Sequence, residues 1–174
     1  MITFKIINKN NINRLTKKEL NQIIYFLNIE NKFYKFDKLK KSDFTNRLIN
    51  KYSYIFIFEN EQIVGGFRYF KNLIKDRILL NRFIYKNGIY FVIQSVFILP
   101  KSRGKGFCSK LLQYFFEKIS PQKTVIAVDS ENKIAIKCYL KNGFKKIVER
   151  KITNKFLDSK KINIDKEFLL IKII

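Results

Sequence analysis

The residues whose types and spacing most suggest chemistry form one short segment, Arg103-Gly104-Lys105-Gly106-Phe107-Cys108. An apolar strand pattern precedes this segment and an amphipathic helix pattern follows it, so its small residues fall at a helix N-terminus. A helix N-terminus presents free backbone N–H groups and the positive end of the helix dipole, and both favour a bound phosphate. Gly104 and Gly106 would let backbone amides approach such a ligand closely. The segment therefore predicts an anion-binding turn.

A second segment, residues 129–144, has the pattern of a helix with a cap at each end. Asp129 or Ser130 can act as the N-cap, because both side chains accept hydrogen bonds from amides of the first turn. Gly143 falls where a helix ends in the left-handed conformation that glycine favours. This segment follows the anion-binding turn by about one strand and one helix.

Together the two segments resemble the GNAT superfamily of acyl-CoA-dependent N-acyltransferases. The pyrophosphate loop of that family has Arg or Gln, two residues, Gly, one residue, and then Gly or Ala. Residues 103–108 match this pattern except that Cys108, which is small and keeps its amide, stands in the last position. The later family helix carries Asn, Ala, an aromatic residue and Gly-Phe, which are here Asn132, Ala135, Tyr139, Gly143 and Phe144. The match is firm over roughly residues 54–150.

The resemblance implies acetyl-CoA as the acyl donor and assigns its binding to a defined set of residues. These are Phe97, Ile98, Arg103, Gly104, Lys105, Gly106, Phe107, Cys108 and Asn132. Backbone amides of residues 104–108 would bind the pyrophosphate, and backbone groups of Phe97 and Ile98 would meet the pantetheine arm and the acyl carbonyl. Asn132 would contact CoA, or it would only cap its helix.

Tyr139 occupies the family position of the general acid that protonates the CoA thiolate. A phenol can deliver a proton to a thiolate of comparable basicity; the alternative is an aromatic side chain that only packs in the core. The general base has no candidate in the sequence. The family often uses a carboxylate in the strand before the loop, and residues 89–99 contain none. Gln94 and Ser95 could only position a water molecule.

The cysteine and histidine contents exclude several classes of site. The chain has no histidine and two cysteines, which excludes Ser-His-Asp and Cys-His nucleophilic sites and an ordinary zinc site. Cys108 and Cys138 both fall on predicted helices, so we expect free thiols and an intracellular, reducing location. No apolar run approaches the roughly 20 residues that span a bilayer, and residues 1–7 have a strand pattern rather than that of a signal peptide.

The net charge is +22, from 36 basic and 14 acidic residues. Such a charge favours nucleic acid, an anionic membrane surface or an anionic cofactor. However, Lys, Asn, Ile, Phe and Tyr are all abundant and Trp is absent, which is also the pattern that AT-rich codon bias produces. We therefore expect nucleic acid not to be the partner.

Hydrophobic periodicity predicts one α/β domain over residues 1–174 with a mixed sheet. The resemblance implies that this sheet is GNAT-like, central and mostly antiparallel, with helices flanking both faces. The predicted strands are 2–7, 52–58, 63–70, 89–99, 124–128, 144–152 and 166–174, and the predicted helices are 15–28, 36–49, 107–119 and 129–143. The pair Gly65-Gly66 inside a strand predicts a bulge or a close backbone approach. Residues 71–88 have no clear pattern.

The sequence therefore predicts an N-acetyltransferase that moves an acetyl group from acetyl-CoA to a primary amine of a small molecule, an amino sugar or a peptide. Two alternatives stay open: a non-catalytic CoA-binding sensor, and a basic nucleic-acid-binding domain that uses lysines and aromatics such as Phe33, Tyr34 and Phe36. The expected acceptor-facing regions, 29–50 and 153–165, carry few distinctive residues. They leave the acceptor open, and the sequence also does not decide whether the chain forms a homodimer.

Overall fold

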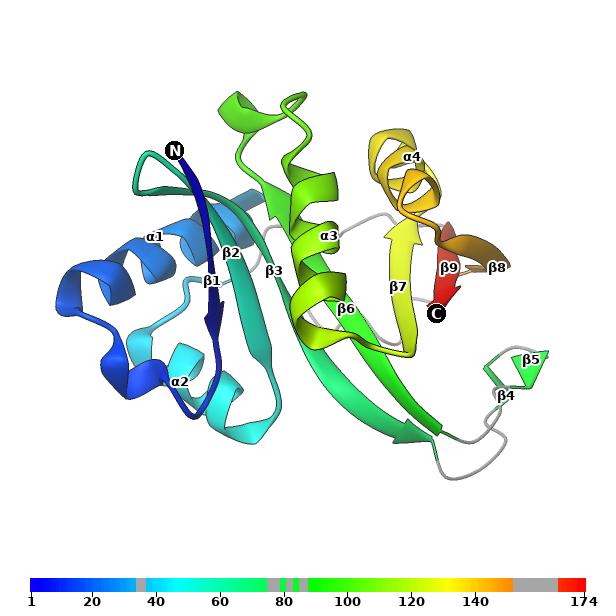
Figure 1. The fold of residues 1–174 in the computed structure, drawn as a ribbon, viewed down its shortest axis with the longest axis horizontal. Coiled ribbons are helices and arrows are strands. Elements are labelled where there is room, and N and C mark those ends of the chain that lie inside the picture. The colour runs from blue at the N-terminus through cyan, green and yellow to red at the C-terminus, as the bar shows by residue number, and fades with distance from the viewer. Residues whose placement is uncertain (34–36, 75–78, 81–82, 85–87, 152–165) are drawn as a thin grey trace.

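The computed structural model describes residues 1–33, 37–74, 79–80, 83–84, 88–151 and 166–174. The elements follow one another in the order that the sequence predicts (Figure 1). In chain order they are β1 (Ile2–Ile7), η1 (Ile12–Arg14), α1 (Lys17–Phe33), α2 (Lys41–Asn50), β2 (Ser53–Glu59), β3 (Gln62–Ile74), β4 (Leu79–Leu80), β5 (Phe83–Ile84), β6 (Gly88–Ile98), η2 (Pro100–Ser102), α3 (Phe107–Ile119), β7 (Lys123–Asp129), α4 (Lys133–Lys141), β8 (Lys145–Lys151) and β9 (Lys166–Ile173).

One seven-stranded sheet forms the centre of the molecule, in the order β1-β2-β3-β6-β7-β9-β8. The pair β6–β7 is parallel, and the other neighbouring strands of this sheet are antiparallel. The crossover between the two parallel strands contains α3, as a parallel connection requires. The predicted mixed, mostly antiparallel sheet is therefore confirmed. The short strands β4 and β5 pair separately.

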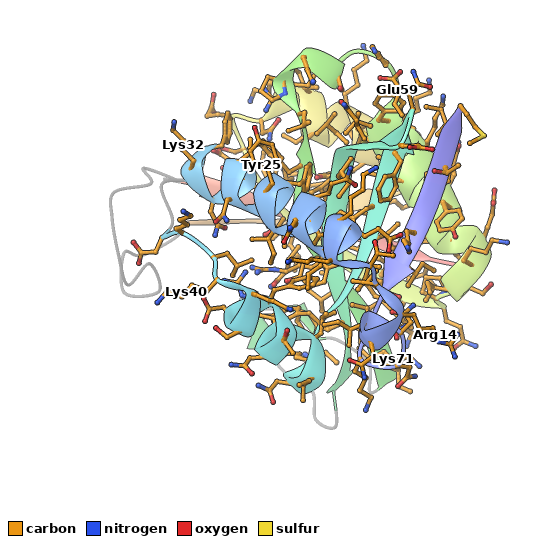
Figure 2. All side chains as sticks on the ribbon, turned by 90° about the vertical axis from the view of Figure 1, so that its left-hand side faces the viewer. Arg14, Tyr25, Lys32, Lys40, Glu59 and Lys71 are labelled. Carbon is orange, nitrogen blue, oxygen red and sulfur yellow. A yellow bond between two sulfur atoms is a disulfide. The ribbon has the colours of Figure 1, made fainter. Side chains whose placement is uncertain are left out.

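Helices cover both faces of the sheet, and strand β2 shows how the sequence arranges this. Its side chains alternate: Tyr54 and Phe56 pack in a cluster with α1 and α2, whereas Ile55 and Ile57 pack in a cluster with α3. The period of two places successive side chains on opposite faces of the sheet. We call these the α1–α2 face, seen in Figure 2, and the α3–α4 face.

The parallel pair β6–β7 separates partway along its length. The two strands pair from Phe91 and Thr124 as far as Ile93 and Ile126. Just beyond, β6 carries one extra residue against β3, because Gly66 faces Phe97 while Arg68 faces Gln94. Ser95 lies at this bulge with a φ of 54°. A bulge bends its strand and increases the local twist, so β6 leaves β7 here and the sheet opens toward α3 and α4.

The glycine pair of β3 faces the last residues of β6, across that strand from the opening, and meets both predictions made for it. Strand β3 bulges against β2, since Ile57 faces Gly65 while Phe58 faces Ile63. A Cβ atom added to Gly66 would lie 2.7 Å from the Phe56 ring and 2.8 Å from the carbonyl oxygen of Ile55. Any larger residue at position 66 would therefore push strands β2 and β3 apart.

Several element bounds differ from the predictions. Helix α1 continues to Phe33, and α2 starts at Lys41 rather than at residue 36. The N-cap of α4 is Asn132 rather than Asp129 or Ser130, because Asp129 is still part of β7. Its carboxylate instead accepts a hydrogen bond from the Glu131 amide at 2.9 Å. The expected acceptor-facing region 153–165 and parts of residues 71–88 lie outside the described residues.

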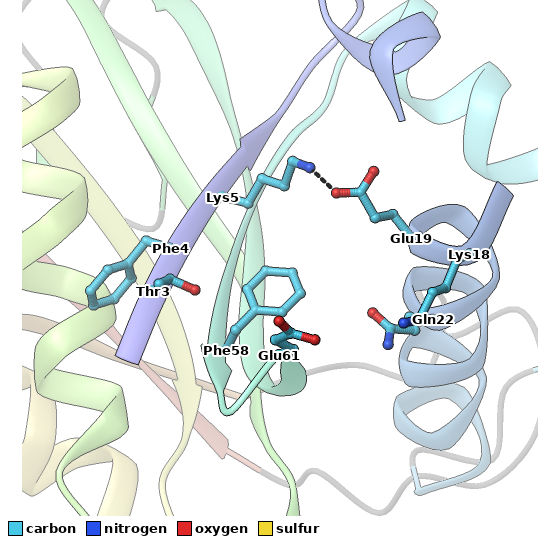
Figure 3. Close-up of a pocket in the computed structure, with 8 residues that line it drawn as sticks. All are labelled: Thr3, Phe4, Lys5, Lys18, Glu19, Gln22, Phe58 and Glu61. Atoms are coloured by element: carbon cyan, nitrogen blue, oxygen red, sulfur yellow. Dashed lines mark hydrogen bonds and ion pairs between the residues drawn. The ribbon is translucent and has the colours of Figure 1, made fainter. Parts of the chain in front are cut away.

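A hollow between the edge strand β1 and helix α1 is occupied by an ion pair (Figure 3). Lys5 of β1 donates to Glu19 of α1, and this hydrogen bond, together with bonds from Thr16, lowers the pKa of Glu19 to about 2. The two charges compensate each other. In the sheet, strands β2 and β3 lie between β1 and β6. The ion pair therefore connects β1 to α1, and the hollow does not border the opening between β6 and β7.

Candidate active site

The glycine turn after β6 adopts the conformation that its composition predicts. Gly104 and Gly106 have φ values of 81° and 76°, in the left-handed region that side chains rarely adopt. A Cβ atom added to either would meet nothing within 4 Å, so glycine is required for the backbone conformation rather than for space. The turn is exposed, and α3 begins directly after it at Phe107.

Consecutive backbone amides of this turn point away from the protein's own acceptors. The amides of Ser102 and Arg103 bond to Leu99 and Pro100 within η2, and the amide of Lys110 makes the first bond of α3, to Gly106. Between them, the amides from Gly104 to Ser109 donate to no acceptor in the described part of the chain. Successive N–H groups of this kind form a concave anion-binding nest at the positive end of a helix dipole.

The basic side chains in and beside the turn contact neighbours on four different elements. Lys105 pairs with Glu59 at the end of β2, with 3.1 Å between Nζ and Oε2. Arg103 donates from Nε to the Ile98 carbonyl at 3.2 Å, and its guanidinium lies 5.2 Å from the centre of the Phe33 ring. Lys110 lies 5.5 Å from the ring centre of Phe107, which is buried. Positive charge therefore surrounds the turn on several sides.

The last residues of β6 divide their backbone groups between the sheet and the opening. The Leu99 amide donates to the Val64 carbonyl of β3 at 2.9 Å. Since backbone groups alternate sides along a strand, Phe97 also directs its amide and carbonyl toward β3, and Ile98 directs its own toward the opening between β6 and β7. The Phe97 ring is buried on the α1–α2 face, 5.9 Å from Phe26.

Helix α4 is fixed at both ends by the caps that carry the family motif. Asn132 accepts a hydrogen bond from the Ala135 amide at 3.1 Å, so it caps the helix. At the other end Gly143 has a φ of 85°, and the amides of Gly143 and Phe144 bond to Leu140 and Tyr139. These are the two bonds of a Schellman cap.

Tyr139 lies in the last turn of α4 and is 4% exposed. Its ring centre is 6.0 Å from that of Phe144, and both residues belong to the core cluster that α3 shares with the sheet. The aromatic side chain therefore packs in the core at the end of the helix that follows β7.

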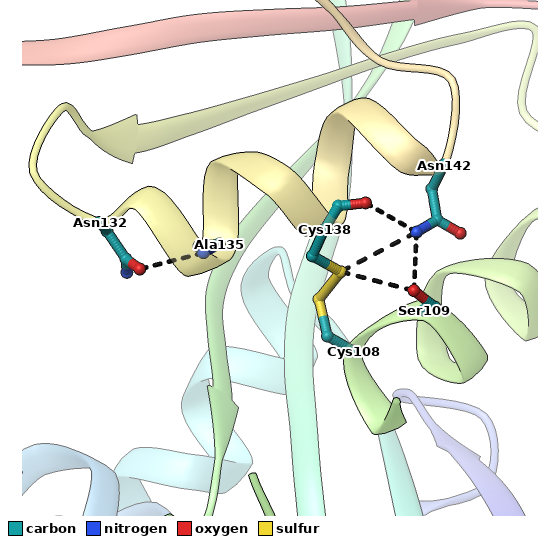
Figure 4. The surroundings of a disulfide bond; sticks show 6 residues. All are labelled: Cys108, Ser109, Asn132, Ala135, Cys138 and Asn142. Atoms are coloured by element: carbon teal, nitrogen blue, oxygen red, sulfur yellow. Dashed lines mark hydrogen bonds between the residues drawn. A yellow bond between two sulfur atoms is a disulfide. The ribbon is translucent and has the colours of Figure 1, made fainter. Parts of the chain in front are cut away.

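Cys108 and Cys138 form a disulfide, so the prediction of two free thiols is wrong (Figure 4). Their Cα atoms are 6.7 Å apart, within the range that a disulfide spans. Ser109 and Asn142 continue the connection, with 3.0 Å between Nδ2 and Oγ. The bond ties the first turn of α3, beside the amide nest, to α4. The sequence could not show this, because the two cysteines are 30 positions apart and meet only when α3 and α4 pack together.

A buried polar cluster on the α1–α2 face was not among the site residues predicted from the sequence. Glu30 of α1 is 7% exposed and shares a small cavity with polar side chains from four further elements. These are Arg47 of α2, Tyr54 of β2, Arg68 of β3 and Ser95 of β6. The available signal was a glutamate at an inward-facing position of α1, three residues after Leu27, where the helical period requires an apolar residue.

Burial of this cluster raises the pKa of Glu30. Desolvation raises the pKa of Glu30 from 4.5 to about 7, although the charge of Arg68, a hydrogen bond from Ser95 and the charge of Arg47 act in the opposite direction. Burial also raises the pKa of Tyr54, again opposed by Arg68 and Arg47. The Tyr54 hydroxyl and Arg68 Nε are buried without a hydrogen-bond partner among the described residues.

The sequence profile of the acetyltransferase (GNAT) family matches residues 23–144, from α1 to the end of α4. The chain belongs to this acetyltransferase family. The match includes the turn after β6, the separation of β6 from β7 and both caps of α4. No protein of curated function matches the sequence.

Solved acetyltransferases share the whole fold at low sequence identity. The NAA60 protein of Arabidopsis thaliana, solved with a bisubstrate analogue, is 14% identical with a TM-score of 0.68, and the match covers 100% of this chain and 98% of that one. The ribosomal-protein-S18-alanine N-acetyltransferase of Escherichia coli is 15% identical with a TM-score of 0.64, covering 100% and 94%. Spermidine N-acetyltransferase of Vibrio cholerae is 17% identical with a TM-score of 0.62, covering 99% and 95%.

The described residues meet neither the requirement of a metal site nor that of a membrane-spanning helix. No three His, Cys, Asp or Glu side chains among them gather as a metal ion would require. None of the helices they form is long and apolar enough to cross a membrane.

Proposed function

We propose that this acetyltransferase is one domain over residues 1–174 that moves an acetyl group from acetyl-CoA to a primary amine. The observation that carries the proposal is the row of amides from Gly104 to Ser109 that donate to no acceptor among the described residues. These amides follow the end of β6, the strand that separates from β7 beyond Ile93. The amide row suits the pyrophosphate of CoA, and Arg103, Lys105, Phe107 and Cys108 shape its surroundings. The opening beyond Ile93 offers a path between the strands for the pantetheine arm.

The chemistry needs no protein nucleophile, because a thioester is already activated. The amine nitrogen attacks the acetyl carbon to form a C–N bond, the C–S bond breaks, and a proton reaches the departing thiolate. In this proposal the Ile98 amide, which faces the opening, polarises the acetyl carbonyl, with Phe97 holding the strand. Tyr139 supplies the proton to the thiolate, and Asn132 contacts the CoA chain beside its cap. Positioning and preorganised dipoles provide most of the catalytic effect.

The acceptor belongs to the α1–α2 face in this proposal, because the amide nest lies at the start of α3 on the opposite side of the sheet. Similar structures are named as acting on spermidine and on a ribosomal-protein alanine, so the fold itself accepts both polyamines and peptides. In this chain Arg47 and Arg68 place two positive charges beside one carboxylate on the acceptor side. A polycation would be repelled there, which favours a neutral or anionic amine such as a peptide N-terminus or a phosphorylated amino sugar.

Two measurements test the proposal. Isothermal calorimetry with acetyl-CoA should show binding at one site per chain. A thiol-release assay should then show turnover with at least one of spermidine, a peptide beginning with Ala, the peptide Met-Val-Asn-Ala-Leu, and glucosamine 6-phosphate. A chain that does not bind acetyl-CoA would refute the proposal. Binding without turnover would assign the chain to a CoA sensor, and a salt-sensitive rise in melting temperature with DNA alone would favour nucleic-acid binding.

Location and assembly follow from the same proposal. An enzyme that uses acetyl-CoA is expected inside the cell, although the disulfide removes the argument from free thiols. Thiol alkylation of freshly lysed cells shows whether Cys108 and Cys138 are oxidised in place. Light scattering of the purified chain shows whether it forms a homodimer.

A further inference from the structure

Glu30 is an unusual residue for its position. It lies in the last turn of α1, where the negative end of the helix dipole disfavours a carboxylate. It is also buried, and burial of a charged carboxylate is costly unless other groups compensate for it. Strongly perturbed acids that line a cavity are often functional, because structural stability alone does not favour them. The acetyl transfer proposed above gives this carboxylate no role.

The position of Ser95 connects Glu30 to the reaction. Ser95 lies at the bulge of β6, two residues after Ile93, the last residue of β6 paired with β7. The Ser95 side chain lines the same small cavity as Glu30 and is close enough to lower the pKa of its carboxyl. The bulge therefore lies just beyond the end of the β6–β7 pairing and lines the cavity that contains Glu30.

The cavity beside Glu30 has room for about one water molecule. Its volume is about 10 Å³, near the smallest space that holds a water. A buried water needs several polar partners, and the lining supplies Glu30, Ser95, the Tyr54 hydroxyl and Arg68 Nε. The last two are buried groups without a partner among the described residues, and a bound water would satisfy both.

We infer that Glu30 accepts the proton of the acceptor's ammonium group, passed along Ser95 and a water molecule in this cavity. This inference rests on the proposed acetyl transfer and supplies the base that strand β6 lacks. The ammonium group gives one proton to the Ser95 hydroxyl, Ser95 gives its own proton to the water, and the water gives one proton to a Glu30 oxygen. The neutral amine then attacks the acetyl carbon. The second proton that nitrogen loses balances the one gained by the thiolate, and Glu30 returns its proton to solvent.

The charges around Glu30 suit this role. Arg68 of β3 and Arg47 of α2 face it, with the neutral Tyr54 of β2 and Ser95 of β6. Burial alone would keep the acid protonated, and the two guanidiniums bring its pKa back to about 7. A base of this pKa is partly ionised at neutral pH and still basic enough to take a proton from an amine through water.

The experiment compares Glu30→Gln and Glu30→Asp with a matched control, Glu117→Gln, which removes an exposed carboxylate from α3. Each variant is assayed by thiol release with acetyl-CoA and the fastest amine of the panel above, from pH 5.5 to 9. If no amine reacts, the same profile is recorded for acetyl-CoA hydrolysis, with water as the acceptor. Acetyl-CoA affinity is measured by calorimetry, and folding by thermal melting.

We expect Glu30→Gln to lower kcat about 100-fold at pH 7.5 and to remove the rise in kcat that the wild type shows near pH 7. Acetyl-CoA affinity should stay within about twofold of the wild type. Glu30→Asp should restore part of the rate, and Glu117→Gln should match the wild type. A folded Glu30→Gln variant with an unchanged pH profile would overturn the inference. So would an enzyme that binds acetyl-CoA but shows neither transfer nor hydrolysis. A wild-type protein that does not bind acetyl-CoA would instead refute the proposed function.

Discussion

The two faces of the sheet build their parts of the site in different ways. On the α3–α4 face, consecutive backbone amides of one turn form the nest, and local caps hold the helices. On the α1–α2 face, single side chains from α1, α2, β2, β3 and β6 meet around one small cavity. A ligand site made of consecutive backbone groups is local in sequence, whereas a site made of scattered side chains exists only after folding. The two halves should therefore respond differently to mutation.

The largest expected effect is at the amide nest. Gly106→Asp adds a carboxylate where the proposed pyrophosphate lies, at a backbone conformation with a φ of 76°. We expect acetyl-CoA affinity to fall at least 100-fold in calorimetry, because charge repulsion and backbone strain act together. Gly106→Asn is the control, since asparagine has the same shape, no charge and a tolerance for this conformation. Equal affinity for the two variants would mean that the turn does not bind an anion.

The disulfide should give the next largest effect, and on stability rather than on chemistry. Cys138→Ser removes a cross-link that closes a loop with a sequence separation of 30. Loop-closure entropy predicts a loss of about 3.6 kcal/mol in the free energy of unfolding, measured by urea denaturation. Reduction of the wild type should produce the same loss, and the variant should not respond to reductant. If reductant leaves the wild type unchanged, the two sulfurs are not bonded in solution.

Tyr139→Phe tests the α3–α4 face at the proposed proton donor. The ring is kept, so packing against Phe144 is preserved and only the hydroxyl is lost. We expect kcat to fall about 100-fold with little change in acetyl-CoA affinity. Tyr114→Phe, on α3, is the matched control and should leave kcat unchanged. An unaltered kcat for Tyr139→Phe in single-turnover conditions would assign the residue to core packing.

Glu30 makes the stability of the α1–α2 face depend on pH. Its folded pKa of about 7 lies above the ordinary 4.5, so the folded state binds more protons between these values. The contribution of Glu30 to the free energy of unfolding is fully present below about pH 4.5. It is lost as the pH rises through about 7, which lowers the free energy of unfolding by about 2–3 kcal/mol. Glu30→Gln should flatten this part of the stability profile, measured by urea denaturation from pH 4.5 to 8. A variant with the wild-type slope would show that another group titrates there.

The smallest effect is expected at the contact between the turn and β2. Glu59→Gln removes the ion pair with Lys105, in which both side chains are partly exposed. Exposed pairs of this kind contribute less than about 1 kcal/mol. The freed lysine should raise acetyl-CoA affinity slightly, by about two- to threefold at low salt, and the gain should vanish at high salt. A tenfold loss would mean that Glu59 positions the turn.

The sequence alone determined the elements, their order, the sheet type and the glycine turn at the start of α3. Each depends on local chemistry: alternation in β2, the apolar face of α3, and glycine where φ is positive. Only the tertiary structure decided the disulfide between Cys108 and Cys138 and the cluster around Glu30. These depend on which helix faces and strand positions meet, and residues far apart in the chain carry no shared pattern before they are brought together. The N-cap of α4 was missed for a smaller reason, because β7 continued to Asp129 through its pairing with β9.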